Sequence, residues 1–428
     1  MGGEAHRQVR LKEVLQGNLR NGYSPKEVPQ WTGVLALGLG CLTGDGFVPR
    51  QLKRVPDTPE ARRALLQEGD LLVSRANTRE LVGLAGRYQD VGAPCIYPDL
   101  MMRLRVNASQ CLPSYMELVL RSDAVRRELR ALARGTSESM VKISAGAVEN
   151  LVVPLPSLDG QRQIVAAHKA VEHRIAALER VQAKSSVAEA ALSANALASG
   201  VDKWPIQRLE SIATVAAGVT LGSEPTGDGV VELPYLRVAN VLDGRIDTAE
   251  VKTVRILRSQ YDRYALRPGD LLLTEGGDLD KLGRGAVWDG RLAPCLHQNH
   301  VFRVRCSDVL SSDFLELYTS SPAGRAYFQS VGKQTTNLAS INSTQVKDMP
   351  VPVPPPEEQD RLLAPVRAIR ARIAALSSQI EKLKAVQKGM TEDLLTGRMR
   401  LEAVPRLLPR PRPSLSLSDS ADRLRPRP

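Results

Sequence analysis

The chain has 428 residues, of which 43% are hydrophobic and 25% charged, and its formal net charge is +11 at pH 7. This length allows two or three domains with proper cores, and the composition is that of an ordinary globular protein. No apolar run approaches the ~18 residues of a membrane span, and the N-terminus lacks a secretory apolar region, so we expect a cytoplasmic protein with no membrane partner. The five cysteines form no CxxC pair. Cys95 and Cys295 recur within Ala-Pro-Cys, and we interpret them as buried strand residues in a reducing compartment.

The positive charge favours a polyanionic partner, but it is unevenly distributed. Eight arginines and three acids lie from Arg398 onward, so the rest of the chain keeps a charge of about +6. Any basic surface on the folded part must therefore be local. Residues 399–428 are rich in Pro, Arg and Ser, and we predict that this tail is disordered.

Residues 1–153 are predicted to form a first compact α/β domain. Gly69-Asp70 reads as a turn that feeds a buried strand at 71–73, followed by a polar loop at 75–79. The remaining expected elements are strands at 93–96 and 103–106, a helix at 115–132, a flexible polar loop at 134–139, and a strand at 148–153.

Residues 154–200 are predicted to form a first long helix. Pro154-Leu155-Pro156 precedes Gln161, and a helical run follows. Its apolar side is formed at helical spacing by Ile164, His168, Val171, Ile175, Leu178 and Val181.

Residues 201–353 repeat the order of the first domain. Gly269-Asp270 stands 200 residues after Gly69-Asp70, a helix is expected at 314–328, and a polar loop at 332–337. The loops at 75–79 and 275–279 do not match. A shared scaffold with divergent loops is what two readers of different sequences need.

Residues 354–398 are predicted to form a second long helix, ~60 Å in length at ~1.5 Å per residue. Its apolar residues recur every three or four positions from Leu362 to Leu394, and Glu357-Glu358 suits the positive end of the helix dipole. Gln359 stands 198 residues after Gln161, and the sequence 174–178 is repeated letter for letter at 372–376. The chain therefore contains an internal duplication of one α/β domain plus one long helix.

No catalytic signature is present. The sequence contains no P-loop and no Asn/Asp-Pro-Pro-aromatic motif of amino-methyltransferases. His297 and His300 are expected to face opposite sides of a strand, which disfavours a metal site. Glu357 and Glu358 are better explained as helix-start charges than as an acid/base pair. We expect neither catalytic residues nor a metal or cofactor in this chain.

These features resemble the DNA-specificity subunit of type I restriction–modification systems. The resemblance covers about residues 8 to 401. It rests on the tandem domains, the Val-Pro-x-Pro-Pro-x-Glu-Glu-Gln stretch at 351–359, the Gly-Asp-Leu-Leu strands, and the Leu-Leu-Thr-Gly-Arg ending at 394–398. One departure is Ser-Leu-Asp-Gly-Gln at 157–161, where the family usually has Glu before Gln.

The resemblance implies a mixed α/β fold with two target-recognition domains, each reading one half of a bipartite site on double-stranded DNA. The two long helices would pack as an antiparallel coiled coil that fixes the separation of the domains. Methyltransferase subunits would dock on the helical regions, and restriction/translocase subunits would join them. S-adenosylmethionine, ATP and Mg would serve those partners, and this chain would be a non-catalytic targeting subunit.

Base readout favours Arg, Lys, Asn and Gln at polar edges, where they reach donors and acceptors in the major groove. In the first domain the candidates are Arg75, Asn77, Arg79, Arg134, Thr136 and Ser137. In the second domain they are Arg237, Asn240, Lys333, Gln334, Thr335 and Asn337. Partner docking is expected on the outer helix faces, including Arg367, Arg370, Lys382 and Lys384.

Three alternatives stay open from the sequence. A related specificity subunit of a methylation-only or other phage-defence complex would have the same features. A coiled-coil scaffold without a nucleic-acid role is disfavoured by the duplicated domains with basic, glycine-containing loops. A stand-alone enzyme is disfavoured by the missing motifs.

Overall fold

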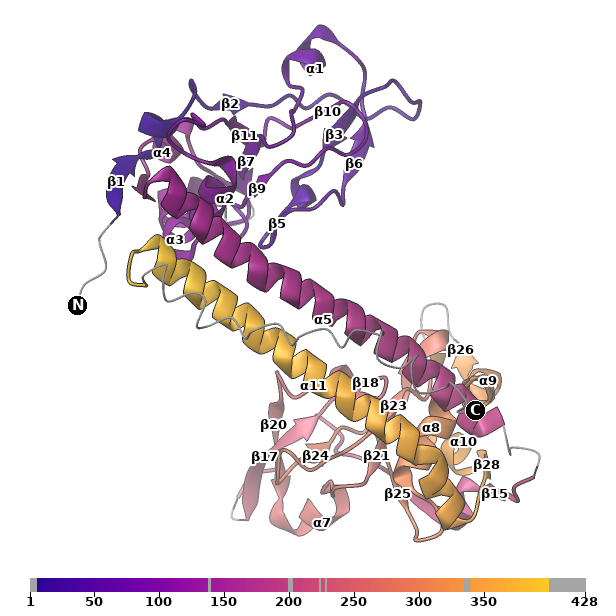
Figure 1. The fold of residues 1–428 in the computed structure, drawn as a ribbon. Helices are drawn as coiled ribbons and strands as arrows, with labels where there is room; N and C mark the ends of the chain where they lie inside the picture. Colours follow the sequence, from indigo (N-terminus) through magenta and orange to yellow (C-terminus); the bar gives the residue numbers. More distant parts are fainter. Residues whose placement is uncertain are drawn as a thin grey trace, which may run out of the picture. The chain divides into compact units, whose positions relative to one another are not determined.

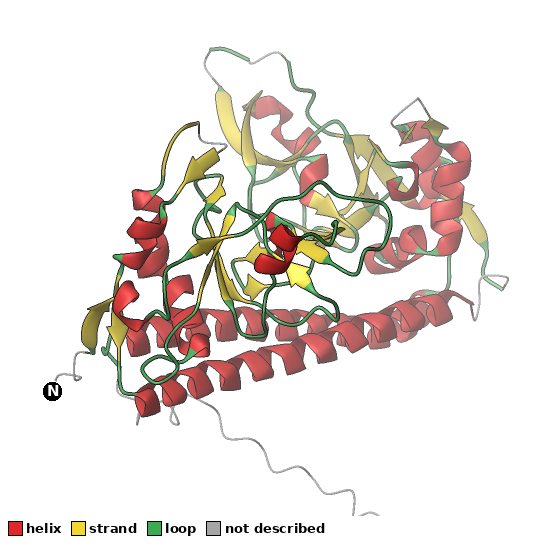
Figure 2. Cartoon of the chain, turned by 90° about the horizontal axis from the view of Figure 1, so that it is seen from above, coloured by secondary structure: helices red, strands yellow, loops and turns green. Residues whose placement is uncertain are grey.

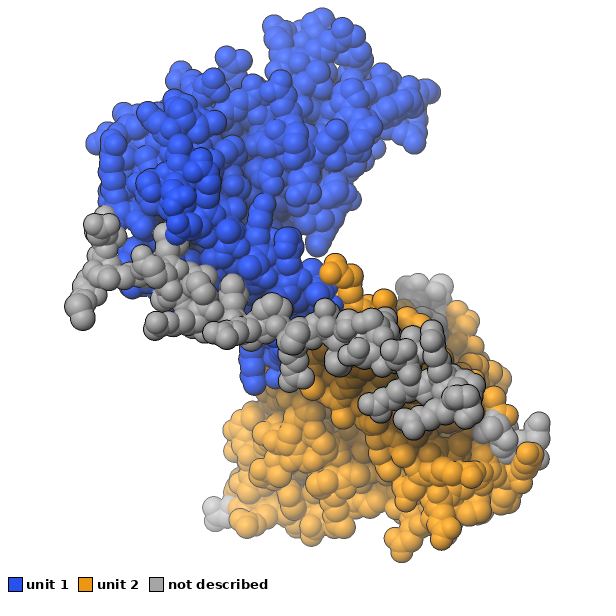
Figure 3. Space-filling model, viewed as in Figure 1, with its two compact units in different colours: residues 1–179, 378–428 blue, residues 180–377 orange. Residues whose placement is uncertain are grey.

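The computed structural model describes residues 6–137, 140–198, 203–222, 225–227, 229–334 and 339–399. The predicted tail at 399–428 lies outside these residues except for Met399. The chain forms two compact units (Figure 3), which are Met1–Glu179 with Ser378–Pro428, and Arg180–Ser377. We call them unit 1 and unit 2. The division runs through both long helices, so each unit contains one α/β body and a segment of each helix.

The two long helices are α5 (Leu158–Ala198) and α11 (Pro356–Leu395) (Figure 1). In unit 1, His168 Nδ1 and Thr391 Oγ1 form a 2.9 Å hydrogen bond between them. In unit 2, Gln182 Nε2 donates to Ser377 Oγ at 2.6 Å. A second pair joins Lys384 to Glu179 in unit 1 and Arg370 to Glu189 in unit 2. Within each unit, residues that come later on α5 therefore contact residues that come earlier on α11, so the helices pack antiparallel. The predicted helix pair is confirmed, and its packing is that of a coiled coil.

The α/β body of unit 1 consists of short strands joined by long loops (Figure 2). Its strands are β1 (Arg7–Arg10), β2 (Arg20–Asn21), β3 (Leu35–Leu37), β4 (Leu42–Thr43), β5 (Gly46–Phe47), β6 (Leu52–Arg54), β7 (Leu71–Ser74), β8 (Ala76–Asn77), β9 (Ala85–Arg87), β10 (Cys95–Ile96), β11 (Met101–Leu104), β12 (Arg134–Ser137), β13 (Met140–Lys142) and β14 (Val152–Leu155). Its α-helices before α5 are α1 (Pro59–Arg63), α2 (Pro113–Arg121), α3 (Asp123–Leu132) and α4 (Ala145–Glu149), and its 3-10 turns are η1 (Leu11–Val14) and η2 (Leu39–Cys41).

Unit 2 contains the corresponding elements. Its strands are β15 (Ile206–Arg208), β16 (Ala213–Ala217), β17 (Val230–Leu236), β18 (Val241–Leu242), β19 (Arg245–Ile246), β20 (Lys252–Leu257), β21 (Leu271–Thr274), β22 (Gly276–Gly277), β23 (Gly285–Val287), β24 (Leu296–His297), β25 (Val301–Cys306), β26 (Lys333–Gln334), β27 (Ala339–Ser340) and β28 (Pro350–Pro352). Its shorter helices are α6 (Leu209–Ile212), α7 (Tyr261–Tyr264), α8 (Ser312–Ser320), α9 (Pro322–Val331) and α10 (Ser343–Lys347), with 3-10 turns η3 (Val238–Asn240), η4 (Arg258–Gln260) and η5 (Leu279–Lys281).

The sheets of the two units have matching strand orders. The four-stranded sheet β2-β11-β7-β9 corresponds to β16-β25-β21-β23, and the three-stranded sheet β10-β3-β6 corresponds to β24-β17-β20. A second three-stranded sheet, β12-β13-β8, corresponds to β26-β27-β22. The pairs β1-β14 and β4-β5 correspond to β15-β28 and β18-β19. The duplication predicted from the sequence is therefore a duplication of topology.

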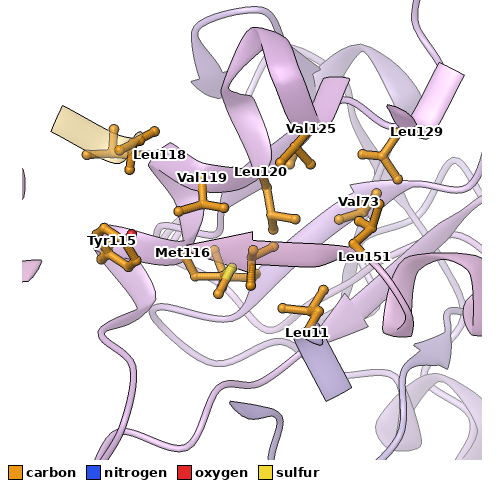
Figure 4. Packing of buried hydrophobic residues seen from close by; sticks show 14 of the residues in the cluster. Leu11, Val73, Tyr115, Met116, Leu118, Val119, Leu120, Val125, Leu129 and Leu151 are labelled. Carbon is orange, nitrogen blue, oxygen red and sulfur yellow. The ribbon is translucent and has the colours of Figure 1, made fainter. Parts of the chain in front are cut away.

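Each unit has a core to which its segments of the long helices contribute. In unit 1, α2 and α3 bury Tyr115, Met116 and Leu129 against strand β7 and the turn at Leu11 (Figure 4). Val171 of α5 belongs to the same cluster. In unit 2 the corresponding cluster includes Leu363 and Val366 of α11. The apolar sides of the long helices thus help to complete the domain cores, as well as facing each other.

The repeated glutamines fix the start of each long helix. The Gln161 side chain accepts a 2.8 Å hydrogen bond from Leu112 N and donates to Pro156 O at 3.0 Å. Gln359 accepts from Ser311 N at 2.8 Å and donates to Pro354 O at 2.8 Å. Both glutamines are buried. The Pro-x-Pro…Gln motif therefore ties the helix start to the loop before α2 or α8, and the departure at 157–161 leaves this bond intact.

The repeated Gly-Asp turns have a matching structural role. Asp70 accepts two hydrogen bonds from the Arg105 guanidinium, at 2.6 and 3.1 Å. Asp270 accepts two from Arg305, at 2.7 and 2.8 Å. Both carboxylates are buried away from water. The bidentate pairing with arginine replaces the hydrogen-bond donors of water and balances the negative charge. The motif is part of the scaffold.

The structure corrects several predicted elements. The helices predicted at 115–132 and 314–328 are each two helices, because Ser122 and Ser321 cap a new helix after a break. The strand predicted at 103–106 is β11, which begins two residues earlier, and the segment 148–153 begins in α4 and continues in β14. The loops predicted at 75–79, 134–139 and 332–337 include the strands β8, β12 and β26. Two- to four-residue polar strands have no hydrophobic alternation, and the sequence pattern could not show them.

Cys95 and Cys295 are buried as predicted, Cys95 within β10 and Cys295 directly before β24. Burial raises the pKa of each thiol to about 12. None of the helices formed by the described residues has the length and apolar character required to cross a membrane.

Candidate nucleic-acid interface

The sheet β12-β13-β8 brings together several of the predicted DNA-binding residues in unit 1. Arg134 in β12 pairs with Lys142 in β13, and Val141 of β13 pairs with Asn77 in β8. Two segments far apart in the sequence thereby form one surface. Thr136 and Ser137 also belong to β12, but their side chains lie outside the described residues.

One side of this sheet opens into a hollow of about 610 Å³. Arg75, Arg134 and Lys142 line it together with Glu128 of α3. Among the described residues, Arg75 Nη1 donates only a long 3.4 Å hydrogen bond to Asp99 O, and Arg134 is exposed. Three cations and one acid therefore surround a space that an anion or a base edge can enter.

A second hollow lies on another side of α3, and sequence reasoning found only one of its arginines. Arg79 lines it together with Arg127, Arg130 and Glu80. The signal for the missed residues was available, because 126–130 reads Arg-Arg-Glu-Leu-Arg within one helix. In the sequence this run is interpreted only as part of the helix predicted at 115–132.

Arg126 holds the two sides of this second hollow together. Its buried guanidinium donates to Val82 O at 2.6 Å and to Glu80 O at 2.9 Å. Burial, followed by the nearby charge of Arg130, lowers the pKa of Arg126 to about 10. Arg126 thus attaches the loop that contains Arg79 to α3.

In unit 2 the corresponding sheet carries only part of the predicted set. Lys333 and Gln334 are exposed on β26, where Lys333 pairs with Ser340 and Gln334 with Ala339 of β27. Thr335 and Asn337, which we also predicted, lie outside the described residues.

Arg237 and Asn240 do not join this surface, and both have structural roles. The Asn240 side chain is buried and donates 2.9 Å hydrogen bonds to Asp247 O and Glu250 O. It also accepts from Arg237 N at 2.9 Å, and Arg237 forms an ion pair with Glu250 at 3.2 Å. With both amide hydrogens donated inside the unit, Asn240 stabilises a loop, and we withdraw it as a base-reading candidate, whereas base reading by Arg237 stays a prediction.

The histidines of the His-Gln-Asn-His segment have separate environments. His297 is buried, and its Nδ1 lies 2.7 Å from Val301 O. Burial lowers the pKa of His297 to about 4, so the ring is neutral near pH 7. His300 is exposed and forms a 2.5 Å bond with Glu275. Within the described part of the chain, no group of three or more His, Cys, Asp or Glu side chains is placed to hold a metal ion.

No protein-family model matches the chain. Among curated proteins, it is 26% identical over 198 residues to the putative type I restriction enzyme MjaX specificity subunit of Methanocaldococcus jannaschii, an alignment that spans 46% of each chain. It is 27% identical over 188 residues to the type I restriction enzyme EcoKI specificity subunit of Escherichia coli K12, across 42% of this chain and 39% of that one. The chain thus spans less than half the length of these two relatives.

Solved structures extend the likeness over nearly the whole chain. A chain from work on complex assembly and conformational transition of the type I R-M system aligns with a TM-score of 0.57 and 20% identity, over 93% of this chain and 100% of that one. The type I restriction–modification S subunit from M. genitalium aligns with a TM-score of 0.50 and 12% identity, over 91% and 96%. The chain is a relative of the type I specificity subunits. Its fold is the specificity-subunit fold, with duplicated domains and paired long helices.

The helix residues suggested for docking partners of a specificity subunit are mostly engaged within their own unit. Arg370 donates to Glu316 at 2.6 Å and to Glu189 at 2.7 Å. Arg367 pairs with Asp313 at 2.8 Å, and Lys384 with Glu179 at 3.2 Å. Arg370 was wrongly placed on an outer face, because it bridges α11, α5 and α8. Lys382 is exposed on α11 and has no ion-pair partner among the described residues.

Proposed function

We propose that this chain is the non-catalytic DNA-specificity subunit of a type I restriction–modification complex. The domain at 1–153 and the domain at 201–353 each read one half of a bipartite site on double-stranded DNA. The likeness to type I specificity subunits in sequence and fold supports the family, and the polar sheets described above support the mode of reading.

One observation carries the proposal. The sheets β12-β13-β8 and β26-β27-β22 have the same strand order, yet their side chains differ. Arg134 corresponds to Lys333, and Asn77 corresponds to Gly277. Domains that shared one ligand would keep these side chains alike. Two domains that read different half-sites need a common scaffold with different donors and acceptors, since each base pair presents its own pattern in the major groove.

The paired helices suit a rigid spacer between the two readers. Domains that read the same face of B-DNA require half-sites about one helical turn apart, ~34–36 Å, and a helix pair fixes a distance better than a flexible linker. Methyltransferase subunits dock on the helical regions, and restriction/translocase subunits join them in the cytoplasm. The S-adenosylmethionine, ATP and Mg of the reaction belong to those subunits, and this chain contributes the DNA-sequence specificity.

The test is to co-express the full chain with its cognate methyltransferase subunit and to map the methylated adenines on plasmid DNA. We expect a split motif with two defined halves. A chimeric chain, in which the domain at 201–353 is replaced by that of a relative with a different target, should change one half only. Absence of both methylation and sequence preference would overturn the proposal. A single undivided motif would overturn the assignment of one half-site to each domain.

A further inference from the structure

Six positions around α3 and its neighbouring sheet in unit 1 are all basic. We call this set the unit 1 basic face. It consists of Arg75, Arg79, Arg127, Arg130, Arg134 and Lys142. The two hollows described above contain all six, and α3 contributes residues to both hollows.

The repeated topology identifies the equivalent positions in unit 2. Arg134 pairs with Lys142 as Lys333 pairs with Ser340. Helices α3 and α9 both begin directly after a capping serine, so Arg127 corresponds to Ala326 and Arg130 to Gln329. Arg75 directly follows β7 as Glu275 follows β21, and four residues further on Arg79 corresponds to Leu279.

The two faces therefore differ in charge. The equivalents in unit 2 are Glu275, Leu279, Ala326, Gln329, Lys333 and Ser340. Only Lys333 is basic, and Glu275 is acidic and bonded to His300. At these six equivalent positions, unit 1 thus has six cations, whereas unit 2 has one cation and one acid. Since the backbones correspond, the difference lies in the side chains.

The described residues do not neutralise the charge of Arg127 and Arg130 on α3. The Nε atoms of these two arginines donate long 3.3 Å bonds to carbonyls of their own helix, Asp123 O and Arg126 O. No carboxylate of the described residues forms an ion pair with either guanidinium. Among the described residues, the acids that line the hollows are Glu80 and Glu128, fewer than the cations around them.

Closely spaced arginines repel one another, and an external anion relieves this repulsion. The guanidinium fork matches the geometry of a phosphate oxygen pair. The candidate base reader Arg134 begins β12 two residues after the end of the same helix, and Asn77 lies in the same three-stranded sheet. The anion next to a base-reading surface is the DNA backbone.

We propose that Arg127 and Arg130 contact the phosphate backbone of duplex DNA, and that unit 2 has no equivalent contact. The salt-dependent part of DNA affinity is then carried mainly by unit 1. This inference rests on the proposed DNA-reading function and assigns different tasks to the two halves.

The test measures DNA binding by the full chain as a function of salt, with a fluorescent duplex of random sequence and with the mapped target. Each phosphate contact contributes ~0.9 to the slope of log K against log salt. The double variant R127Q/R130Q should therefore reduce the slope by about 2. It should weaken binding several-fold at about 50 mM salt, equally for both duplexes.

Two controls accompany this variant. R127K/R130K keeps the charge and should retain the wild-type slope. R62Q/R63Q changes the net charge by the same amount at exposed residues of α1 that pair with Asp57 and Glu60, and it should also retain the slope.

An unchanged slope in R127Q/R130Q, or an equal fall in R62Q/R63Q, would overturn the inference while the wild-type chain still selects its target. Failure of the wild-type chain to bind either duplex would overturn the proposed function itself. A loss confined to the target duplex would show base readout by these arginines and would contradict the phosphate assignment.

Discussion

Arg370 of α11 donates a 2.6 Å hydrogen bond to the buried carboxylate of Glu316 in α8. Burial raises the pKa of the Glu316 carboxyl even though the guanidinium next to it acts in the opposite direction. Burial of the Glu316 carboxylate therefore costs more than the pairing returns there, whereas at Arg370 burial is outweighed by the pairing with Glu316 and Glu189, which raises the pKa of the guanidinium. The pair joins a long helix to the α/β body of unit 2.

Arg370→Ala should destabilise the chain by ~3–5 kcal/mol, because it leaves the Glu316 carboxylate buried without a partner. The double variant R370M/E316L removes both charges and should recover most of this loss. Urea unfolding of the full chain, followed by circular dichroism, measures both. A double variant that is as unstable as the single one would show that the ion pair itself stabilises the unit.

The apolar residues of α11, which recur at helical spacing from Leu362 to Leu394, are not equally buried. Ile380 is 3% exposed and lies in the core of unit 1, whereas Ile373 is only half-buried. Ile380→Ala should therefore cost ~2–5 kcal/mol, and Ile373→Ala should cost clearly less, since fewer contacts are lost. Both losses of unfolding free energy are measured by urea unfolding. Equal losses in the two variants would contradict this description.

The helices, the duplication and the buried Gly-Asp strands were predictable because each has a strong local or repeated signal. Ser122 was not recognised as a break, since one capping residue interrupts a helical pattern without changing its periodicity. Asn240 was misassigned because its loop resembles a polar recognition loop, and only the tertiary position of Glu250 shows that its amide is occupied. Arg127 was overlooked because a basic residue on a helix is usually solvated, and its neighbour Arg79 comes from a distant segment.

His297 makes stability depend on pH. Its pKa is about 4 in the folded chain against an ordinary value of 6.5, so the unfolded state binds the proton more readily. The neutral ring stabilises the folded state above pH 6.5, and this contribution is lost as pH falls toward 4, up to about 3 kcal/mol. Unfolding at several pH values should show that His297→Asn has a flatter profile between pH 6.5 and 4.

Asn77 and Gln334 should each affect a different half of the DNA site. Asn77→Ala removes a side chain from the sheet of unit 1, and Gln334→Ala removes one from the sheet of unit 2. A side chain that reads a base contributes ~1–3 kcal/mol of discrimination, so each variant should relax one half-site at one or two positions and leave the other unchanged. Asn240→Ala is the control. Because its amide is bonded within unit 2, it should lower stability and leave the methylated motif the same. Methylation mapping on a plasmid library separates these outcomes, and relaxation of both half-sites by a single variant would count against independent reading by the two domains.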